Sequence, residues 1–324
     1  MFSWILQILI MSDIRSPIPV VDVDKIGMHR KSDEIDKASL EAVALSLKNS
    51  FCKYGVCYFK NHGIEYEDKF IHISEAFFKQ PLDVKTQHLR GTRRDFGYSP
   101  VGQEKANLEN PVDLKESFNY QPGDDQDDWM DNAFPDACKE MFGQCSVFGY
   151  RVLDALSLAL GQRQTFLRDS SARIGTQDNP TTLRSLYYPP IPLDMTTKPG
   201  EIRFPEHSDY GTISFLFQDE VGGLEVDFPG KGFVEVIPIP GTILVMAADL
   251  LQRWTADAVV STPHRVLIPA EESKKRKPRQ SAVFFILPDN DYVVKPLDGS
   301  AKYKPITCME YLQPKMTQLV GVTY

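Results

Sequence analysis

The sequence predicts a mostly β protein with flanking helices, in which a helical N-terminal half packs against a β-rich C-terminal core. From about residue 181 onward, short segments rich in Val, Ile, Phe and Tyr follow one another between Gly and Pro turns. Before that point, the longer apolar patterns have helical spacing. So many short strands in succession predict an antiparallel sandwich or barrel. No linker-like composition interrupts the chain, so we expect one compact unit.

The elements of the N-terminal half follow from local patterns and helix breakers. Runs of β-branched and aromatic residues predict strands within residues 18–23, 56–64 and 113–120. Apolar positions at helical spacing predict helices over residues 38–55, 67–81 and about 136–162. These helices are expected to stop at Gly55, at Pro81 and near Gly161. The acidic stretch 123–136 predicts a solvated loop.

The C-terminal half predicts a series of strands closed by one helix. Strand-like segments occupy residues 182–190, 211–219, 223–249, 264–269 and 279–288. Residues 309–316 predict the closing helix. The short basic run at 274–277 lies between two of the strand-like segments, and we expect it to be a solvated loop.

The overall charge and the cysteines narrow the class of protein. The net charge is −8, the pI is about 5.4 and there is no basic stripe, which argues against nucleic acid and anionic membrane as partners. The five cysteines are odd in number, scattered and without a CxxC pair. A disulfide framework or a zinc site is therefore not expected, and a reducing, cytoplasmic compartment fits best. The sequence does not indicate an oligomeric state.

The first ten residues, MFSWILQILI, are apolar but too short to span a bilayer. They also lack the charged region that begins a signal peptide. We expect residues 1–16 to be a frayed extension, with Met11 as the natural start of the domain. A membrane anchor is the alternative interpretation of this segment.

Three residues combine the side chains and the spacing of a metal site. His207 and Asp209 are one residue apart, and His264 stands at the start of a later strand-like segment. Side chains two apart on a strand project to the same side. Two histidines and one carboxylate on one face of an octahedron leave three positions open, which is typical of non-haem Fe(II) oxygenases. The HxD pair alone could equally be an ordinary turn before a strand, and His62 is expected to be a turn or core histidine.

A second pair of residues could bind the co-substrate that a non-haem Fe(II) oxygenase needs. Fe(II) requires a reductant to activate oxygen, and a 2-oxo acid can chelate the metal and supply two electrons. Its far carboxylate needs a planar, bidentate cation, which arginine provides. Arg279 and Ser281 lie two apart at the start of an apolar strand and should share one face. The other RxS, residues 168–170, lies in a polar stretch and is expected to be a loop.

The N-terminal stretch FCKYGVCYFKNHGI is followed in order by five further motifs, LRSLYYPP, HSDYG, GGLEV, STPHRV and RQS. Together they resemble the isopenicillin N synthase-like group of Fe(II)- and 2-oxoglutarate-dependent dioxygenases. The resemblance implies a double-stranded β-helix, or jelly roll, with Fe(II), 2-oxoglutarate and O2 at its mouth. It implies that His207, Asp209 and His264 bind iron and that Arg279, Ser281 and Tyr188 bind 2-oxoglutarate. Plant relatives usually carry Asn where this chain has Leu186, so any contact from that Asn is absent.

The resemblance covers nearly the whole chain and divides it into five parts. These are an N-terminal extension (1–16), a non-haem dioxygenase N-terminal region (17–135), connecting helices (136–175), the jelly-roll core (176–292) and a C-terminal helical segment (293–324).

The chain looks most similar to fungal members, including thymine 7-hydroxylase-type enzymes and tailoring oxygenases of secondary metabolism. That likeness implies that Arg184, Tyr210 and Phe285 hold the substrate. The plainer alternative is a strand-edge ion pair for the arginine and core positions for both aromatics.

The expected reaction is hydroxylation, or a rearrangement triggered by hydroxylation, of a small planar oxygenated molecule in fungal secondary metabolism. Three alternatives stay open. The first is hydroxylation of thymine or another pyrimidine in salvage. The second is an oxidase of the same fold that needs no 2-oxoglutarate. The third is a binding protein without catalysis.

Overall fold

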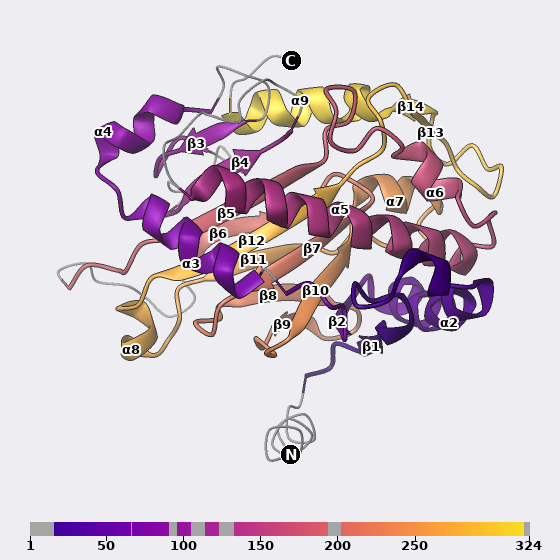
Figure 1. Cartoon of the computed structure of the whole chain (residues 1–324), viewed down its shortest axis with the longest axis horizontal. Helices are drawn as coiled ribbons and strands as arrows, with labels where there is room; N and C mark the ends of the chain where they lie inside the picture. The colour runs from indigo at the N-terminus through magenta and orange to yellow at the C-terminus, as the bar shows by residue number, and fades with distance from the viewer. Residues whose placement is uncertain are drawn as a thin grey trace.

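The computed structural model describes residues 16–65, 67–90, 96–104, 114–122, 133–193 and 202–320. Two β-sheets face each other at the centre, and long helices cover the outer face of the larger sheet (Figure 1). Every strand pair in these two sheets is antiparallel except the one between the first two strands. The predicted antiparallel sandwich is therefore confirmed.

The larger sheet contains strands from both halves of the chain. In spatial order it consists of β1 (Val20–Asp22), β2 (Val56–Lys60), β10 (Thr242–Ala247), β7 (Ile213–Gln218), β12 (Arg279–Ile286), β5 (Thr182–Tyr188), β4 (Glu116–Tyr120) and β3 (Gly97–Ser99). The N-terminal half thus adds two strands to each edge, and the two halves share one hydrogen-bonded sheet.

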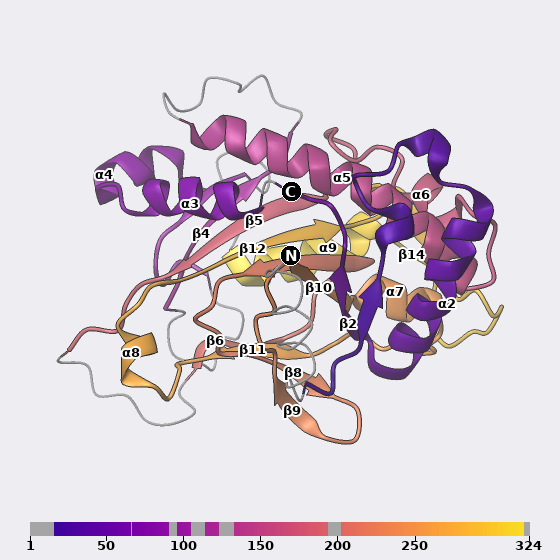
Figure 2. The same cartoon turned by 60° about the horizontal axis from the view of Figure 1, so that its bottom comes forward.

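The smaller sheet packs against the other face of the larger one. It consists of β6 (Ile202–His207), β11 (His264–Leu267), β8 (Leu224–Phe228) and β9 (Gly232–Glu235), and a separate pair is formed by β13 (Val293–Val294) and β14 (Ile306–Thr307). In the view of Figure 2 the smaller sheet lies below the larger one, on the side away from helices α3 (Glu67–Phe78) and α5 (Phe134–Ala159).

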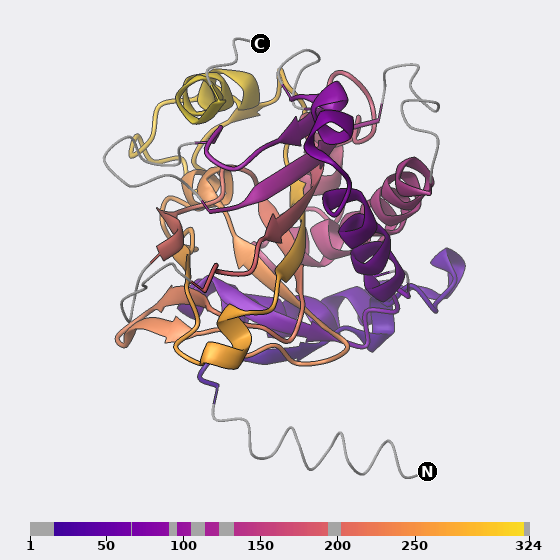
Figure 3. The ribbon, with the colours of Figure 1, turned by 90° about the vertical axis from the view of Figure 1, so that its left-hand side faces the viewer.

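The helices form the outer layer. The longer ones are α2 (Lys37–Tyr54), α3 (Glu67–Phe78), α5 (Phe134–Ala159) and the C-terminal α9 (Cys308–Val320). The short ones are α4 (Leu82–Lys85), α6 (Phe166–Ser170), α7 (Asp249–Trp254), α8 (Glu272–Lys275) and the 3-10 turns η1 (Asp24–Ile26), η2 (Ser32–Glu34) and η3 (Thr86–His88). Helices α3 and α5 contact β5 and β12, whereas α9, yellow in Figure 3, lies at one end of the sandwich.

Most predicted elements are present, and the differences have local causes. The loop predicted for the basic run 274–277 is correct only for its last two residues, because Lys274 and Lys275 belong to the short helix α8, where Lys275 and Arg276 pair with Glu272. The stretch 168–170 is also helical, since Arg168 pairs with Asp154 on α5. The acidic stretch lies largely outside the described residues, and its last three residues begin α5.

Side chains alternate along the strands of the larger sheet and create two cores. On β12, Ala282, Phe284 and Ile286 face the helices. Arg279, Ser281, Val283 and Phe285 line the space between the sheets. This alternation puts the polar RxS pair inside the sandwich, as its spacing predicted.

Replacing Phe77 by Ala should lower the free energy of unfolding by about 3–5 kcal/mol, the usual cost of removing a buried aromatic ring. Phe77 stacks on Phe134 with ring centres 4.6 Å apart and makes edge contacts with Tyr98 and Phe118. Urea unfolding checks the value. Val147→Ala, at a position 46% exposed on α5, is the control and should change it by about 0.5 kcal/mol or less. A loss below about 1 kcal/mol for Phe77→Ala would show that this cluster does not hold α3 in place.

None of the helices in the described ranges is long and apolar enough to cross a bilayer. The apolar segment 1–10 and the other residues before position 16 lie outside the described part of the chain. All five cysteines are free thiols, and four of them are buried.

Candidate active site

The three candidate metal ligands come together between the sheets. His207 is the last residue of β6 and pairs across the strands with His264, the first residue of β11. Their ring centres are 4.2 Å apart, and His264 Nε2 lies 3.8 Å from Asp209 Oδ1. One ligand atom from each of the three residues lies within 4.8 Å of the other two. Such spacing allows all three atoms to bind one ion.

Hydrogen bonds orient each of these side chains. Nδ1 of His207 lies 2.9 Å from the Pro205 carbonyl oxygen, and Nδ1 of His264 lies 3.0 Å from the Thr262 carbonyl oxygen. A proton held on Nδ1 leaves the Nε2 lone pair free for a metal. The Ser214 hydroxyl donates to Asp209 Oδ2 and leaves Oδ1 facing His264. Burial, with the neighbouring His264, lowers the pKa of His207 well below its usual value, which favours the neutral form that binds metals.

His207 and Asp209 were predicted to project to the same side of one strand, but the structure positions the aspartate in another way. Strand β6 ends at His207, so Asp209 is not on the same strand and lies in the following connection. Its carbonyl oxygen accepts a hydrogen bond from the Asp249 amide at 2.9 Å. Gly211 packs so closely that an added Cβ would lie 2.4 Å from the Ile286 carbonyl oxygen. Contacts from α7 and β12 therefore place the aspartate.

The space beside the triad that extends toward Arg279 is called the inner cavity, and it has a volume of about 440 Å³. Arg279 is 1% exposed, and its guanidinium lies 3.2 Å from the Ser281 hydroxyl and 5.0 Å from the centre of the Tyr188 ring. Leu186 also lines this cavity. The three residues predicted for 2-oxoglutarate are thus grouped together, and they line the same cavity as the triad.

A second space, which shares His207, Asp209, Arg184 and Phe285 with the inner cavity, is called the outer cavity; it holds about 790 Å³ including space open to solvent. Arg184, Tyr210 and Phe285 all line it, together with His207 and Asp209. The Arg184 guanidinium carbon lies 5.7 Å from the centre of the Phe285 ring. The structure therefore brings the three predicted substrate residues to one cavity beside the metal ligands.

Sequence reasoning missed the partners that hold Arg184. Its Nε donates to Asn119 Oδ1 at 2.8 Å, and its Nη2 lies 3.6 Å from Glu104 Oε1. Glu104 also pairs with Arg90 and Lys115. Burial alone would raise the pKa of Glu104, but these three cations outweigh it and hold the pKa well below its usual value. No local pattern links Asn119 or Glu104 to Arg184, because they lie on distant segments.

Helix α9 provides an apolar wall that the sequence did not indicate. Met309, Leu312 and Met316 line the outer cavity from this helix. The helix is fixed to α7, because the Tyr311 hydroxyl lies 2.6 Å from Asp249 Oδ2. The outer cavity is therefore cationic at Arg184 and apolar at α9.

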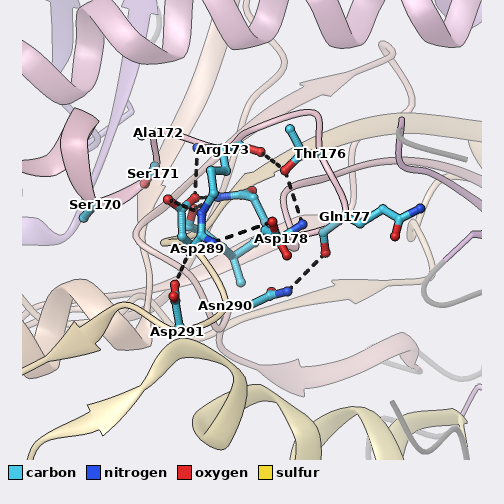
Figure 4. A network of polar contacts seen from close by, with 12 residues as sticks. Ser170, Ser171, Ala172, Arg173, Thr176, Gln177, Asp178, Asp289, Asn290 and Asp291 are labelled. Atoms are coloured by element: carbon cyan, nitrogen blue, oxygen red, sulfur yellow. Dashed lines mark hydrogen bonds and ion pairs between the residues drawn. The ribbon is translucent and has the colours of Figure 1, made fainter.

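A polar network joins the loop before β5 to the segment that follows β12 (Figure 4). The Arg173 amide donates to Asp289 Oδ1 at 3.0 Å, and the Asp289 amide donates to the Ser170 carbonyl at 2.8 Å. Nearby, Asn179 Nδ2 donates to the carbonyl of Leu287, a lining residue, at 3.0 Å. These bonds tie the segment after β12 to the loop before β5.

His62 lies outside this site, as predicted. It is 3% exposed and accepts the Ile64 amide on Nδ1, and burial lowers its pKa to about 4.

Two histidines and one carboxylate grouped inside an antiparallel sandwich, where they line two cavities, are typical of a non-haem iron oxygenase. Comparison with known proteins identifies the family within this class. Residues 180–288 match the 2OG-Fe(II) oxygenase superfamily, and residues 18–137 match the N-terminal region described as non-haem dioxygenase in morphine synthesis. The chain belongs to the 2OG-Fe(II) oxygenase superfamily, and it is a 2-oxoglutarate-dependent dioxygenase with a jelly-roll core that uses Fe(II).

Relatives and solved structures agree with this assignment. The chain is 30% identical over 293 residues to the 2-oxoglutarate-Fe(II) type oxidoreductase ppzD of Metarhizium rileyi, covering 81% of each chain. It is 31% identical over 306 residues to the proline hydroxylase buaE of Petromyces alliaceus, covering 86% of this chain and 93% of the relative. The crystal structure of the full-length thymine 7-hydroxylase of Neurospora crassa with alpha-KG and thymine is 27% identical, with a TM-score of 0.79 and coverage of 93% and 96%.

Proposed function

We propose that this dioxygenase hydroxylates a small oxygenated molecule in secondary-metabolite biosynthesis, with His207, Asp209 and His264 as the iron ligands. The observation that carries the proposal is the position of the triad between the two cavities. A co-substrate in the inner cavity and a substrate in the outer cavity would both reach the open side of the metal. The donor set of two neutral imidazoles and one carboxylate suits Fe(II).

The inner cavity is the place for 2-oxoglutarate in this proposal. Arg279 presents a planar fork to the far carboxylate, Ser281 adds a hydroxyl and Tyr188 covers the guanidinium. When bound, Fe(II) and 2-oxoglutarate supply the oxidising chemistry, with succinate and CO2 as by-products. The protein orients both reactants and excludes water, because the side chains at this end are almost fully buried.

The outer cavity favours a substrate with one oxygen-rich end and one apolar end. Arg184, held by Asn119 and Glu104, would pair with a carbonyl, phenolate or enolate oxygen. Tyr210 and Phe285 would flank a flat ring. The methionines of α9 suit an apolar remainder of variable shape, because methionine side chains adapt readily.

Two relatives suggest other substrates. The thymine 7-hydroxylase of Neurospora crassa is known in complex with thymine, and Petromyces alliaceus buaE is named a proline hydroxylase. Thymine is a planar ring with carbonyl oxygens, so pyrimidine hydroxylation is the second candidate function and uses the same three residues. Arg279 and Ser281 argue against an oxidase of the same fold that needs no 2-oxoglutarate, although that branch can retain the pair. In either case, the free thiols favour a reducing, cytoplasmic compartment.

The proposal is tested first by a substrate screen. Candidate planar phenols, lactones and pyrimidines, and proline for comparison, are offered with Fe(II), 2-oxoglutarate and oxygen. Succinate formation above the uncoupled background, with one new oxygen in the product, identifies the substrate. A preference for proline over every planar compound would contradict the proposed substrate class and leave the dioxygenase assignment intact.

With a substrate in hand, Arg184→Leu should lower kcat/KM for that substrate roughly 10- to 150-fold, the cost of a lost hydrogen bond to a charged group. It should also raise succinate formation relative to product, because an unanchored substrate no longer presents one position to the metal. Iron and 2-oxoglutarate binding should change little. Arg265→Leu, which removes an arginine paired with Glu225 on β8, is the matched control. Coupled turnover by Arg184→Leu at the wild-type rate would rule out this anchor.

A further inference from the structure

Gln121, the residue after β4, lies at the outer cavity in an arrangement that the proposed function does not use. It is 8% exposed and lines this cavity together with Pro180 and Thr182. Its Nε2 donates to the Pro180 carbonyl oxygen at 3.0 Å and to the Thr182 hydroxyl at 2.6 Å. Both hydrogens of the side-chain amide are therefore engaged, and Oε1 remains as an acceptor.

The neighbours of Gln121 fix the direction of its side-chain amide. The Pro180 carbonyl oxygen can only accept hydrogen bonds, and it also accepts the Thr182 hydroxyl at 3.0 Å. Turning the amide around would place Oε1 against this carbonyl oxygen, so that two acceptors would face each other. Among the residues that the structure describes, none donates to Oε1 of Gln121. Because a buried acceptor without a donor is costly, this oxygen suits a ligand that brings a donor.

The strand register brings this acceptor to the same wall as the cationic anchor Arg184. Asn119 on β4 lies opposite Arg184 on β5, and Gln121 bonds across to Thr182 two positions further along. Side chains two apart on a strand share a face, and Thr182 and Arg184 both line the outer cavity. The two cross-strand pairs are about 7 Å apart along the strands. One wall of the outer cavity therefore offers a hydrogen-bond donor and an acceptor within the reach of one small ring.

We propose that the outer cavity takes a cyclic amide, whose carbonyl oxygen accepts from Arg184 and whose ring N–H donates to Oε1 of Gln121. This inference rests on the proposed function and narrows its substrate class. A cyclic amide carries the carbonyl oxygen and the N–H side by side on one edge, so a single flat molecule can meet both side chains. A lactone of the same shape has a ring oxygen in place of the N–H and would set two acceptors against each other. The consequence is selection of lactams and imides over lactones.

The test compares 2-quinolone and coumarin, two flat bicyclic rings of nearly equal shape that share a carbonyl group and differ in a ring N–H against a ring oxygen. Each is titrated calorimetrically into the anaerobic Fe(II) protein with saturating 2-oxoglutarate, so that no turnover occurs. The wild-type Kd for 2-quinolone should be roughly 5- to 150-fold lower than that for coumarin, which corresponds to the cost of leaving a buried acceptor unpaired. Equal Kd values for the two rings would overturn the proposal.

Two variants assign the preference to Oε1 of Gln121. Gln121→Met removes this acceptor and should raise the Kd for 2-quinolone until most of the preference is lost, whereas the Kd for coumarin should not rise. Thr182→Val removes one anchor of the amide but keeps Oε1, so it should retain most of the preference. Gln144→Met makes the same chemical change as Gln121→Met on α5, where Gln144 pairs with Glu140, and it is the matched control that should keep the full preference.

The ratio of the two Kd values separates a binding role from a structural one. Equal weakening of both rings in Gln121→Met would show that the residue only shapes the cavity and would overturn the proposal. A preference for 2-quinolone that survives this substitution would also overturn it. Failure of the wild type to bind either ring would instead contradict the flat-ring substrate of the proposed function, on which the inference depends.

Discussion

His264→Ala is expected to abolish turnover and to weaken Fe(II) binding by more than about 100-fold. The proposed centre has only three protein ligands, and loss of even an outer hydrogen-bond partner of a metal ligand typically costs about 10- to 100-fold in metal affinity. His264 is buried, and its Nδ1 is already engaged by the Thr262 carbonyl, so only Nε2 remains for the metal. Anaerobic titration with Fe(II) and a turnover assay measure the two effects.

A graded set of variants makes this result specific. Ser214→Ala removes the hydroxyl that holds Asp209 Oδ2 and should weaken Fe(II) binding by about 10- to 100-fold, with some turnover left. His72→Ala makes the same chemical change at an exposed position of α3 and should have no effect. Wild-type iron binding and activity in His264→Ala would remove the third ligand and with it the proposed centre.

Arg279→Leu should raise the apparent KM for 2-oxoglutarate far more than the KM for the primary substrate. Removing one partner of a desolvated charge pair costs about 2–5 kcal/mol, or roughly 30- to several thousand-fold in affinity. The Arg279 guanidinium is held in place by the Gly222 carbonyl and the Ser281 hydroxyl, so no other orientation competes with carboxylate binding. Succinate formation at increasing 2-oxoglutarate concentration measures the change.

Ser281→Ala provides the comparison within the same pair and should cost about 0.5–3 kcal/mol, depending on the charge of its partner. Arg276→Leu, an arginine on the surface of the segment before β12, should leave both KM values unchanged. If Arg279→Leu keeps the wild-type dependence on 2-oxoglutarate, the far carboxylate lies elsewhere and the role of the inner cavity must be reassigned.

The sequence predicted the fold correctly where a single helix or strand has a clear hydrophobic pattern of its own. Helices α2 and α5 show apolar periodicity, and the residues that follow them include Gly55 and Gly161, both with positive φ. Strand β12 has an uninterrupted apolar run of the kind expected for a strand in the middle of a sheet. Strand β6 was missed, because it is an edge strand that includes Pro205 and the exposed Glu206, and its pairing with β11 is irregular.

The triad and the RxS pair could also be found in the sequence, for a physical reason. Metal binding needs particular side chains, and few histidines are available, so His207, Asp209 and His264 stand out. Arg279 and Ser281 share a face because they lie two apart on one strand. The same rule did not apply to the HxD pair, since β6 ends at His207 and packing against α7 and β12 places Asp209.

By itself, then, the sequence determined the fold class and indicated the candidate metal ligands and the arginine proposed for the co-substrate, because each depends on residue type and local spacing. Only the tertiary structure decided what surrounds them. Asn119 and Glu104 reach Arg184 from other segments, and α9 lines the outer cavity although it lies at the end of the chain. Strand β6 pairs with β11 through two register shifts, and the adjacent residues Arg203 and Phe204 are both buried, which no sequence pattern records. Long-range packing and irregular strand pairing set these positions, and neither can be derived from the neighbours of a residue along the chain.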